Sequence, residues 1–164
     1  MPPVIVGGAV VIPKGLIAKL TGDNTVTTIS AAGRKAVECA AMEAVMNIEA
    51  SFGFKPKDVS RDNCGYDIES EIPEDKRTDK GCLRFIEVKG RAKGSETVTV
   101  SKNEILTAMN KPDEYILALV EVDGDKTKTI YLHCDFKSRP EFSETCRTFN
   151  IRDLIAGSQI LFES

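Results

Sequence analysis

The chain has 164 residues, of which 41% are hydrophobic and 29% are charged, and its formal net charge at pH 7 is −3. This length and balance are typical of one folded domain with a hydrophobic core, and they exclude a disordered chain. The acidic balance counts against avid, independent DNA binding. Five scattered cysteines without a C-x-x-C pair argue against a zinc site or disulfide framework and favour reduced thiols in a cytoplasmic protein.

The amino-terminal part predicts a short extension that packs on the main domain. An apolar run predicts a strand over 4–12, and a helix over 14–20 follows the turn at Pro13. The run is too short to span a bilayer, so no membrane partner is expected. We therefore divide the chain into an extension over 1–29 and a domain over 30–164.

The longest predicted helix covers 31–51. Ser30 is in place to cap its start, its apolar side chains recur at helical spacing, and Gly53 stops it. Short strands are expected next, near 57–60, 64–70, 82–91 and 96–100. The polar segment before the third of these strands has no apolar periodicity, which predicts a solvated, mobile hairpin loop.

A second helix is predicted directly after the strand at 96–100. Ser101 is in position to cap it, and Glu104 stands at the capping-box position. The apolar run over 115–122 predicts a buried strand, and a turn at 123–125 makes it half of a hairpin. The last elements are short: a strand over 128–133, a helix over 151–156 and a strand over 160–162. This order predicts an α/β fold, in which helices flank a mixed central sheet.

Two carboxylates and a lysine stand on consecutive predicted strands. Because side chains alternate between the faces of a strand, Glu87 and Lys89 share one face, while Asp67 belongs to the strand before. Magnesium takes oxygen ligands and keeps several waters, so the carboxylates of Asp67 and Glu87, with the Val88 carbonyl, are candidate metal ligands. Lys89 is suited to orient a water or to offset phosphate charge. A cross-strand ion pair explains the same residues without a metal.

Five strings of the sequence carry a resemblance that covers about 30–122. They are Asp58-Val59-Ser60, Gly65-Tyr66-Asp67-Ile68-Glu69-Ser70, Arg84-Phe85-Ile86-Glu87-Val88-Lys89-Gly90-Arg91, Val98-Thr99-Val100-Ser101-Lys102-Asn103-Glu104-Ile105 and Tyr115-Ile116-Leu117-Ala118-Leu119-Val120. Their order resembles the PD-(D/E)XK restriction-endonuclease-like superfamily, with its α-β-β-β-α-β core. More narrowly, they resemble the domain at the C-terminus of the plant protein NO VEIN, similar to domains at the ends of helicase-like proteins.

The resemblance implies a nuclease that depends on Mg²⁺ or Mn²⁺ and hydrolyses DNA phosphodiester bonds. It also implies a helicase-like ATPase as partner, in cis or in trans, and a role in DNA processing or phage defence. Asp67 takes the acidic position of the motif, Glu87 the second carboxylate and Lys89 the lysine. Tyr66 stands where the superfamily has proline. Many such nucleases pair to cut both strands, so a homodimer is a further expectation.

The superfamily often adds a glutamate from the first helix, for which this chain has three candidates. Glu38 and Glu49 flank the apolar stripe of the predicted helix, and the eleven residues between them return almost to the same azimuth. Glu43 points nearly opposite the stripe, towards solvent. We therefore predict Glu38 or Glu49 as the additional catalytic carboxylate, with surface charges as the alternative for both.

Four further residues are candidate nucleic-acid contacts. Tyr66 can stack on a base, Arg91 belongs to a modest basic rim, and Lys102 and Asn103 open a helix whose free N–H groups suit a phosphate. Each has a plainer interpretation, as a cleft-wall tyrosine, a solvated charge or part of a helix cap. The rival function is a catalytically inactive module of the nuclease fold that binds nucleic acid or protein, and a third is a structural C-terminal domain of a longer protein.

Overall fold

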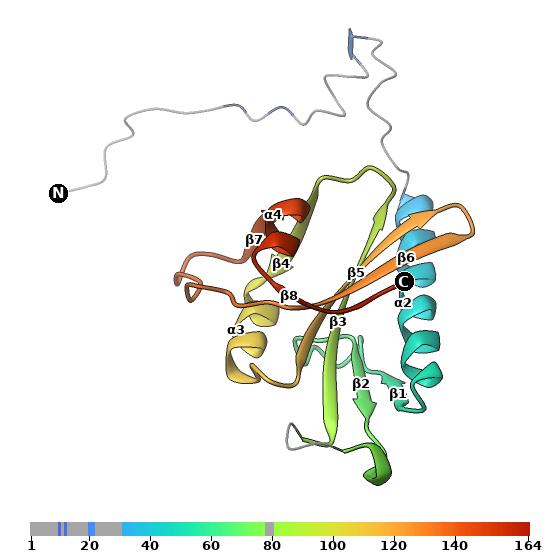
Figure 1. Ribbon diagram of the computed structural model, residues 1–164. Helices are drawn as coiled ribbons and strands as arrows, with labels where there is room; N and C mark the ends of the chain where they lie inside the picture. The colour runs from blue at the N-terminus through green and yellow to red at the C-terminus, as the bar shows by residue number, and fades with distance from the viewer. Residues whose placement is uncertain (1–9, 11, 13–19, 22–30, 78–80) are drawn as a thin grey trace, which may run out of the picture. The chain divides into compact units, whose positions relative to one another are not determined.

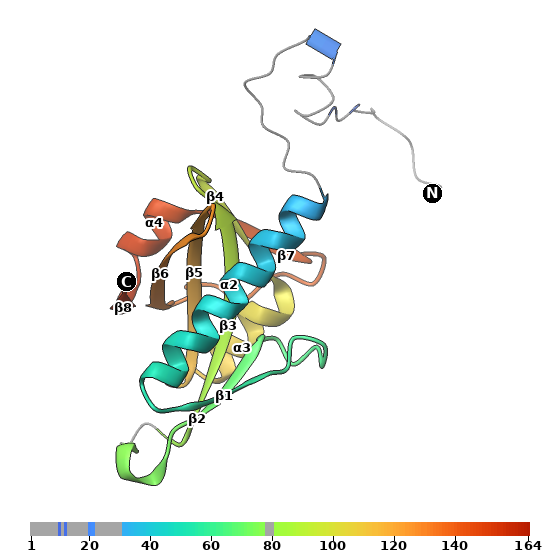
Figure 2. The same cartoon turned by 90° about the vertical axis from the view of Figure 1, so that its right-hand side faces the viewer.

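Figures 1 and 2 show the computed structural model of the protein, which describes residues 10, 12, 20, 21, 31–77 and 81–164. The chain divides into two compact units, Met1–Arg34 and Lys35–Ser164. The predicted strand at 4–12, helix at 14–20 and cap at Ser30 lie almost entirely outside the described residues. The expected packing of 1–29 on the main domain therefore stays a prediction.

A mixed, mostly antiparallel sheet lies at the centre of the second unit. The described strands of this sheet run in the order β1-β2-β3-β5-β6-β8, and β3 pairs with β5 in parallel while the other neighbours are antiparallel. Their bounds are β1 (Lys55–Asp58), β2 (Ile68–Glu71), β3 (Leu83–Ala92), β5 (Tyr115–Asp123), β6 (Lys126–His133) and β8 (Gln159–Glu163). The predicted α/β fold, with helices on a mixed central sheet, is confirmed.

The long helix α2 (Ala31–Ser51) lies along one face of this sheet (Figure 2). Its buried residues Ala41 and Val45 pack against Ile86 of β3 and Ala118 of β5. These strand residues have even numbers and so share one face, as the two-residue period of a strand requires. Gly53, which follows the helix, has a positive φ of 75° and so marks its stop.

The opposite face carries the helices α3 (Lys102–Asn110) and α4 (Ile151–Ala156) and a two-stranded ribbon of β4 (Thr97–Ser101) and β7 (Cys146–Asn150). Ile105 of α3 packs against Phe85 and Tyr115, which are odd-numbered residues of β3 and β5. In the chain, β4 and α3 form the connection between the parallel strands β3 and β5. This crossover holds α3 against the face that carries Glu87 and Lys89.

Most predicted elements agree with the structure, and the differences have local causes. The helix over 31–51 and the helix over 151–156 have the predicted bounds, and Ser101 and Glu104 form the predicted capping box. The predicted strand over 64–70 begins only at Ile68, because positive φ values at Asn63 and Gly65 make the preceding segment a turn. A 3₁₀ turn, η1 (Glu74–Lys76), interrupts the predicted hairpin loop. The strand β7 was not predicted.

All five cysteines lie among the described residues and are free thiols. None of the described helices has the length and hydrophobicity that crossing a membrane would require.

Gly90 is the point where α2 and β3 make their closest approach, and it supplies a test of this packing. A Cβ atom there would lie 2.8 Å from the Cβ of Ala41 and 3.0 Å from the carbonyl oxygen of Val37. We expect Gly90→Ala to lower the free energy of unfolding by about 1–3 kcal/mol, because the added methyl group overpacks the interface. Urea denaturation measures this loss.

A second substitution separates overpacking from a general effect on the strand. Ala41→Gly removes the atom nearest to the new methyl group, so the loss caused by Gly90→Ala should be smaller in the Ala41→Gly background. Equal losses in the two backgrounds would contradict the close approach of the helix.

Candidate functional site

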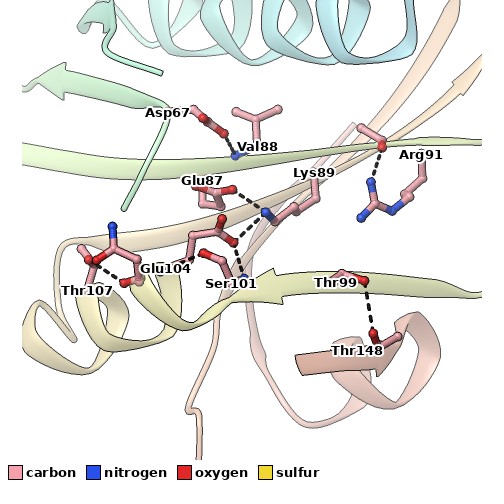
Figure 3. A network of polar contacts seen from close by, with 12 residues as sticks. Asp67, Glu87, Val88, Lys89, Arg91, Thr99, Ser101, Glu104, Thr107 and Thr148 are labelled. Carbon is pink, nitrogen blue, oxygen red and sulfur yellow. Dashed lines mark hydrogen bonds and ion pairs between the residues drawn. The ribbon is translucent and has the colours of Figure 1, made fainter. Parts of the chain in front are cut away.

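The charged pair predicted on β3 lies on the face that α3 covers (Figure 3). Glu87 is 5% exposed, and Lys89 is half-buried. The two side chains share one face of the strand, as the sequence predicted, and they form a buried ion pair in which Lys89 Nζ lies 2.5 Å from Glu87 Oε1. Removing two charged groups from water costs free energy unless the groups are paired. The contact between Glu87 and Lys89 therefore explains why the fold can bury both side chains.

Glu104, in the first turn of α3, completes the environment of the lysine. Its Oε2 lies 2.6 Å from Lys89 Nζ and also accepts a hydrogen bond of 3.0 Å from the backbone N–H of Ser101. The capping-box glutamate is therefore also a partner of the lysine. Sequence reasoning gave Glu104 only the capping role. The contact between Glu104 and Lys89 could have been predicted by placing α3 in the crossover between two parallel strands, because this connection positions the start of the helix over β3.

Asp67 lies at the point where β2 and β3 stop pairing. Its backbone N–H donates to the carbonyl of Ile86, and its carboxylate Oδ2 accepts a hydrogen bond of 2.9 Å from the backbone N–H of Val88. The Asp67 carboxylate thus accepts the hydrogen bond that a backbone carbonyl of β2 would accept if β2 and β3 continued to pair (Figure 3). This bond holds Asp67 next to the residues on either side of Val88, which are Glu87 and Lys89.

The charges of this cluster shift one another's pKa values. Burial raises the pKa of Glu87 to about 8, and the carboxylates of Asp67 and Glu104 add to this while Lys89 opposes it. Burial also raises the pKa of Asp67. The hydrogen bond from the Val88 N–H and the charge of Lys89 lower this pKa, but burial has the larger effect. Burial disfavours the charge on Lys89, but Glu87 and Glu104 outweigh this and raise its pKa. Burial likewise opposes ionisation of Glu104, but Lys89 and the bonds from Ser101 lower its pKa overall.

A hollow of about 420 Å³ opens beside the cluster. Asp67, Val88 and Lys89 line it from β2 and β3, and Glu38 and Asp58 line it from α2 and the end of β1. The structure therefore brings Glu38 to the same hollow as Asp67, as one of the two predicted alternatives requires. Asp58, which sequence reasoning did not select, adds a carboxylate whose Oδ1 accepts a hydrogen bond from the N–H of Ser60.

The structure places Glu49, the other alternative, away from this hollow. Glu49 is fully buried and lies 3.3 Å from Arg84, which is on the opposite face of β3 from Glu87. Eleven residues return the helix to a similar azimuth, but they also advance it by about 16 Å along its axis. Glu38 and Glu49 therefore cannot both reach one site, and of the two only Glu38 lines the hollow beside Asp67. Glu43 is exposed, as expected.

The four predicted nucleic-acid contacts are held by bonds within the protein. Tyr66 packs against Phe85 with 4.7 Å between ring centroids, and burial raises its pKa to about 12. Lys102 Nζ donates to the carbonyl oxygens of Glu141 and Phe142, and the Asn103 amide donates to that of Asn63. Arg91 donates to the carbonyls of Gly90 and Thr97. Tyr66 thus packs against the hydrophobic cluster around Phe85, while Arg91 lines the hollow beside Asp67.

The donor atoms of the cluster suit one kind of metal ion. Within the described ranges 31–77 and 81–164, no three Asp, Glu, His or Cys side chains converge as a metal-binding group. Such a group is what zinc or calcium would require, whereas Mg²⁺ and Mn²⁺ are held by one or two carboxylates together with waters. The carboxylates of Asp67 and Glu87 fit this smaller requirement in number and kind, and the charge of Asp67 adds to the raised pKa of Glu87. Of the two, only Asp67 lines the hollow.

Comparison with protein families identifies the class of this domain. The family described as Protein NO VEIN, C-terminal, matches residues 37–132. The match covers more than half of the 164 residues, so the chain belongs to this family. It includes Asp67, Glu87, Lys89 and Glu104, and it confirms the narrower of the two resemblances. Comparisons with curated proteins and with solved structures give no match.

The raised pKa of Glu87 predicts a dependence of stability on pH. Folded Glu87 keeps a proton between its ordinary pKa of 4.5 and about 8, whereas the unfolded chain releases it. Folding therefore binds a proton in this range, and the free energy of unfolding should fall as pH rises from 5 to 8, by a few kcal/mol in order of magnitude. Urea unfolding at several pH values measures this slope, and Glu87→Gln should flatten it.

The matched control is Glu43→Gln, which removes an exposed carboxylate from α2 and should leave the slope unchanged. If Glu87→Gln kept the slope of the parent protein, Glu87 would not be the group that holds the proton.

Proposed function

We propose that this domain hydrolyses phosphodiester bonds in DNA with the help of Mg²⁺ or Mn²⁺. The observation that carries the proposal is the Asp67 carboxylate, bonded to the backbone of Val88 between Glu87 and Lys89 at the wall of an open hollow. This is the arrangement that the PD-(D/E)XK resemblance implies, so we also propose that the domain belongs to that superfamily. A helicase-like ATPase, in cis or in trans, and a homodimer are the partners that this assignment implies.

The residues of the cluster would have different roles in binding the metal ion, the phosphate and the attacking water. Asp67, Glu87 and the Val88 carbonyl would hold the metal ion, which polarises the phosphate and lowers the pKa of a bound water. Lys89 keeps its proton between two carboxylates, so it acts as a fixed positive charge towards the phosphate or as a donor that orients water. Glu104 holds the lysine in place, and Glu38 faces the same hollow from α2.

The second candidate function is a module that binds nucleic acid or protein without cleaving it. Two observations favour it: the net charge is −3, and the site lysine is already bound to the carboxyl groups of Glu87 and Glu104. A module of this kind would use the fold but not the metal, and it would depend on another protein for affinity.

Metal binding is the first test. Millimolar Mg²⁺ or Mn²⁺ should raise the melting temperature of the parent protein, because a ligand that binds only the folded state stabilises it. Asp67→Asn should abolish this shift, since it removes the charge while its amide oxygen can still accept the Val88 hydrogen bond. Glu43→Gln serves as the control and should retain the full shift. A parent protein without any shift would contradict the metal site.

The same titration has an expected pH dependence. Glu87 must release its proton before it can hold a cation, so the metal concentration at half-maximal shift should decrease as pH rises from 6 to 8. A midpoint that does not change with pH would exclude Glu87 as a ligand.

Cleavage distinguishes the two candidate functions. Plasmid and single-stranded oligonucleotides incubated with Mg²⁺ or Mn²⁺ should be cut by the parent protein, and Lys89→Ala should slow this by roughly 10²-fold or more. Lys89→Ala should still show a metal-induced rise in melting temperature, because the carboxylates remain. Activity that survives both Lys89→Ala and Glu87→Gln would refute the assignment. Binding of DNA without cleavage, unchanged by either substitution, would establish the binding module instead.

A further inference from the structure

A second hollow lies on the other side of Lys89 and Arg91, between the sheet and α4. Its volume is about 200 Å³, and its walls are mainly aliphatic, from Leu119, Ile130, Ile151 and Ile155. Lys89 and Arg91 belong to the linings of both hollows. The polar hollow beside Asp67 and this apolar hollow therefore adjoin across two cationic side chains.

Strand pairing explains why an apolar hollow adjoins the charged site. Lys89 stands beside Leu119 of β5, which stands beside Ile130 of β6, so one row across the sheet changes from charged to apolar. The next row contains Arg91, Glu121 and Lys128, which forms a polar rim. α4 then covers the apolar row with Ile151 and Ile155.

We propose that this hollow receives a single nucleobase, turned out of its stack, from the strand whose phosphate lies at Lys89 and Arg91. The proposal rests on the proposed function, because it extends the same site by one nucleotide. The chemistry of the hollow matches that of a base: aliphatic walls contact the apolar faces of the ring, and the rim presents charged and polar groups to its edges. Pockets for drug-sized ligands measure about 300–1,000 Å³, so this smaller hollow is suited to one ring system.

Arg91 is the residue that connects phosphate and base. Its Nη1 donates 2.7 Å to the carbonyl of Gly90 and its Nε donates 3.3 Å to that of Thr97, so the guanidinium plane is fixed by the backbone. Within the part of the chain that the structure describes, Arg91 forms no ion pair, unlike Lys89 and Lys128. A fixed guanidinium without an ion-pair contact suits a phosphate and can also stack on a planar base. Lys89 and Arg91 leave β3 on the side where β4 runs (Figure 3).

A preference among substrates follows from this geometry. Turning a base out of a duplex costs a few kcal/mol, and the cost is lowest where the base is unpaired or mismatched. The domain should therefore bind single-stranded or unpaired segments more tightly than a perfect duplex of the same sequence.

The test uses a single-stranded oligonucleotide that carries 2-aminopurine at one position, in a series that moves the probe along the strand. This base fluoresces weakly in a stack and more strongly outside it, and the aliphatic walls of the hollow contain no ring to quench it. With Ca²⁺ in place of Mg²⁺ to suppress cleavage, one position of the probe should brighten severalfold on binding to the parent protein. Ile155→Trp, which fills the hollow, should remove this signal and weaken binding by roughly tenfold.

The matched control is Ala156→Trp, which adds the same side chain at the next position of α4, where the residue is exposed and outside the hollow. It should bind and brighten the probe as the parent does. The melting-temperature rise with Mg²⁺ should be equal in the parent and both variants, which shows that the fold and the metal site are intact.

The outcomes separate this inference from the proposed function. If the parent cleaves DNA but no probe position brightens, or if Ile155→Trp behaves like Ala156→Trp, the nucleobase hollow is wrong and the nuclease stands. If the parent neither cleaves nor binds any of the oligonucleotides, the proposed function is wrong and the nucleobase hollow is wrong with it.

Discussion

The half-buried ammonium group of Lys89 is the charge on which the site depends. It lies within 2.6 Å of carboxylate oxygens from both Glu87 and Glu104, and the Asp67 carboxylate interacts with it electrostatically. Carboxylates buried together repel one another and lose hydration, so without a cation among them they would take up protons or separate. The lysine allows this much acidic charge to remain inside a folded domain, on the side of β3 that faces α3.

The parallel pairing of β3 with β5 determines which residues meet the lysine. A parallel pair needs a crossover connection, and here β4 and α3 supply it. The crossover brings the first turn of α3 over Lys89, so that the glutamate of an ordinary capping box becomes a partner of the site. One residue thus links the start of a helix to the charge balance of the strand beneath it. The same pairing places Leu119 next to Lys89 and so fixes the border between the polar and the apolar hollow.

Local patterns in the sequence correctly predicted the face on which a side chain lies. They did not predict which residues from distant parts of the chain lie close together. The alternation of a strand was enough to put Glu87 and Lys89 on one face, and helical spacing was enough to send Glu43 to solvent. The azimuth of a residue around the helix axis does not give its position along the sheet. For this reason helical spacing could not show which of Glu38 and Glu49 lies near Asp67. The contact between Glu104 and Lys89 depends on the long-range crossover between β3 and β5. β7 was missed because its exposure alternates over only five residues and its partner, β4, lies more than forty residues earlier in the chain.

The two buried ionic clusters on β3 differ in a way that supports a cation site on one face only. On the α2 face, Glu49 and Arg84 match one negative charge with one positive charge, and three aromatic rings surround the guanidinium. On the α3 face, three carboxylates share one lysine, which leaves an excess of two negative charges when all are ionised. The raised pKa of Glu87 removes part of this excess by keeping a proton. A divalent cation would balance all of it, and Asp67, which lines an open hollow, is the carboxylate of the cluster that a cation from solvent would meet first.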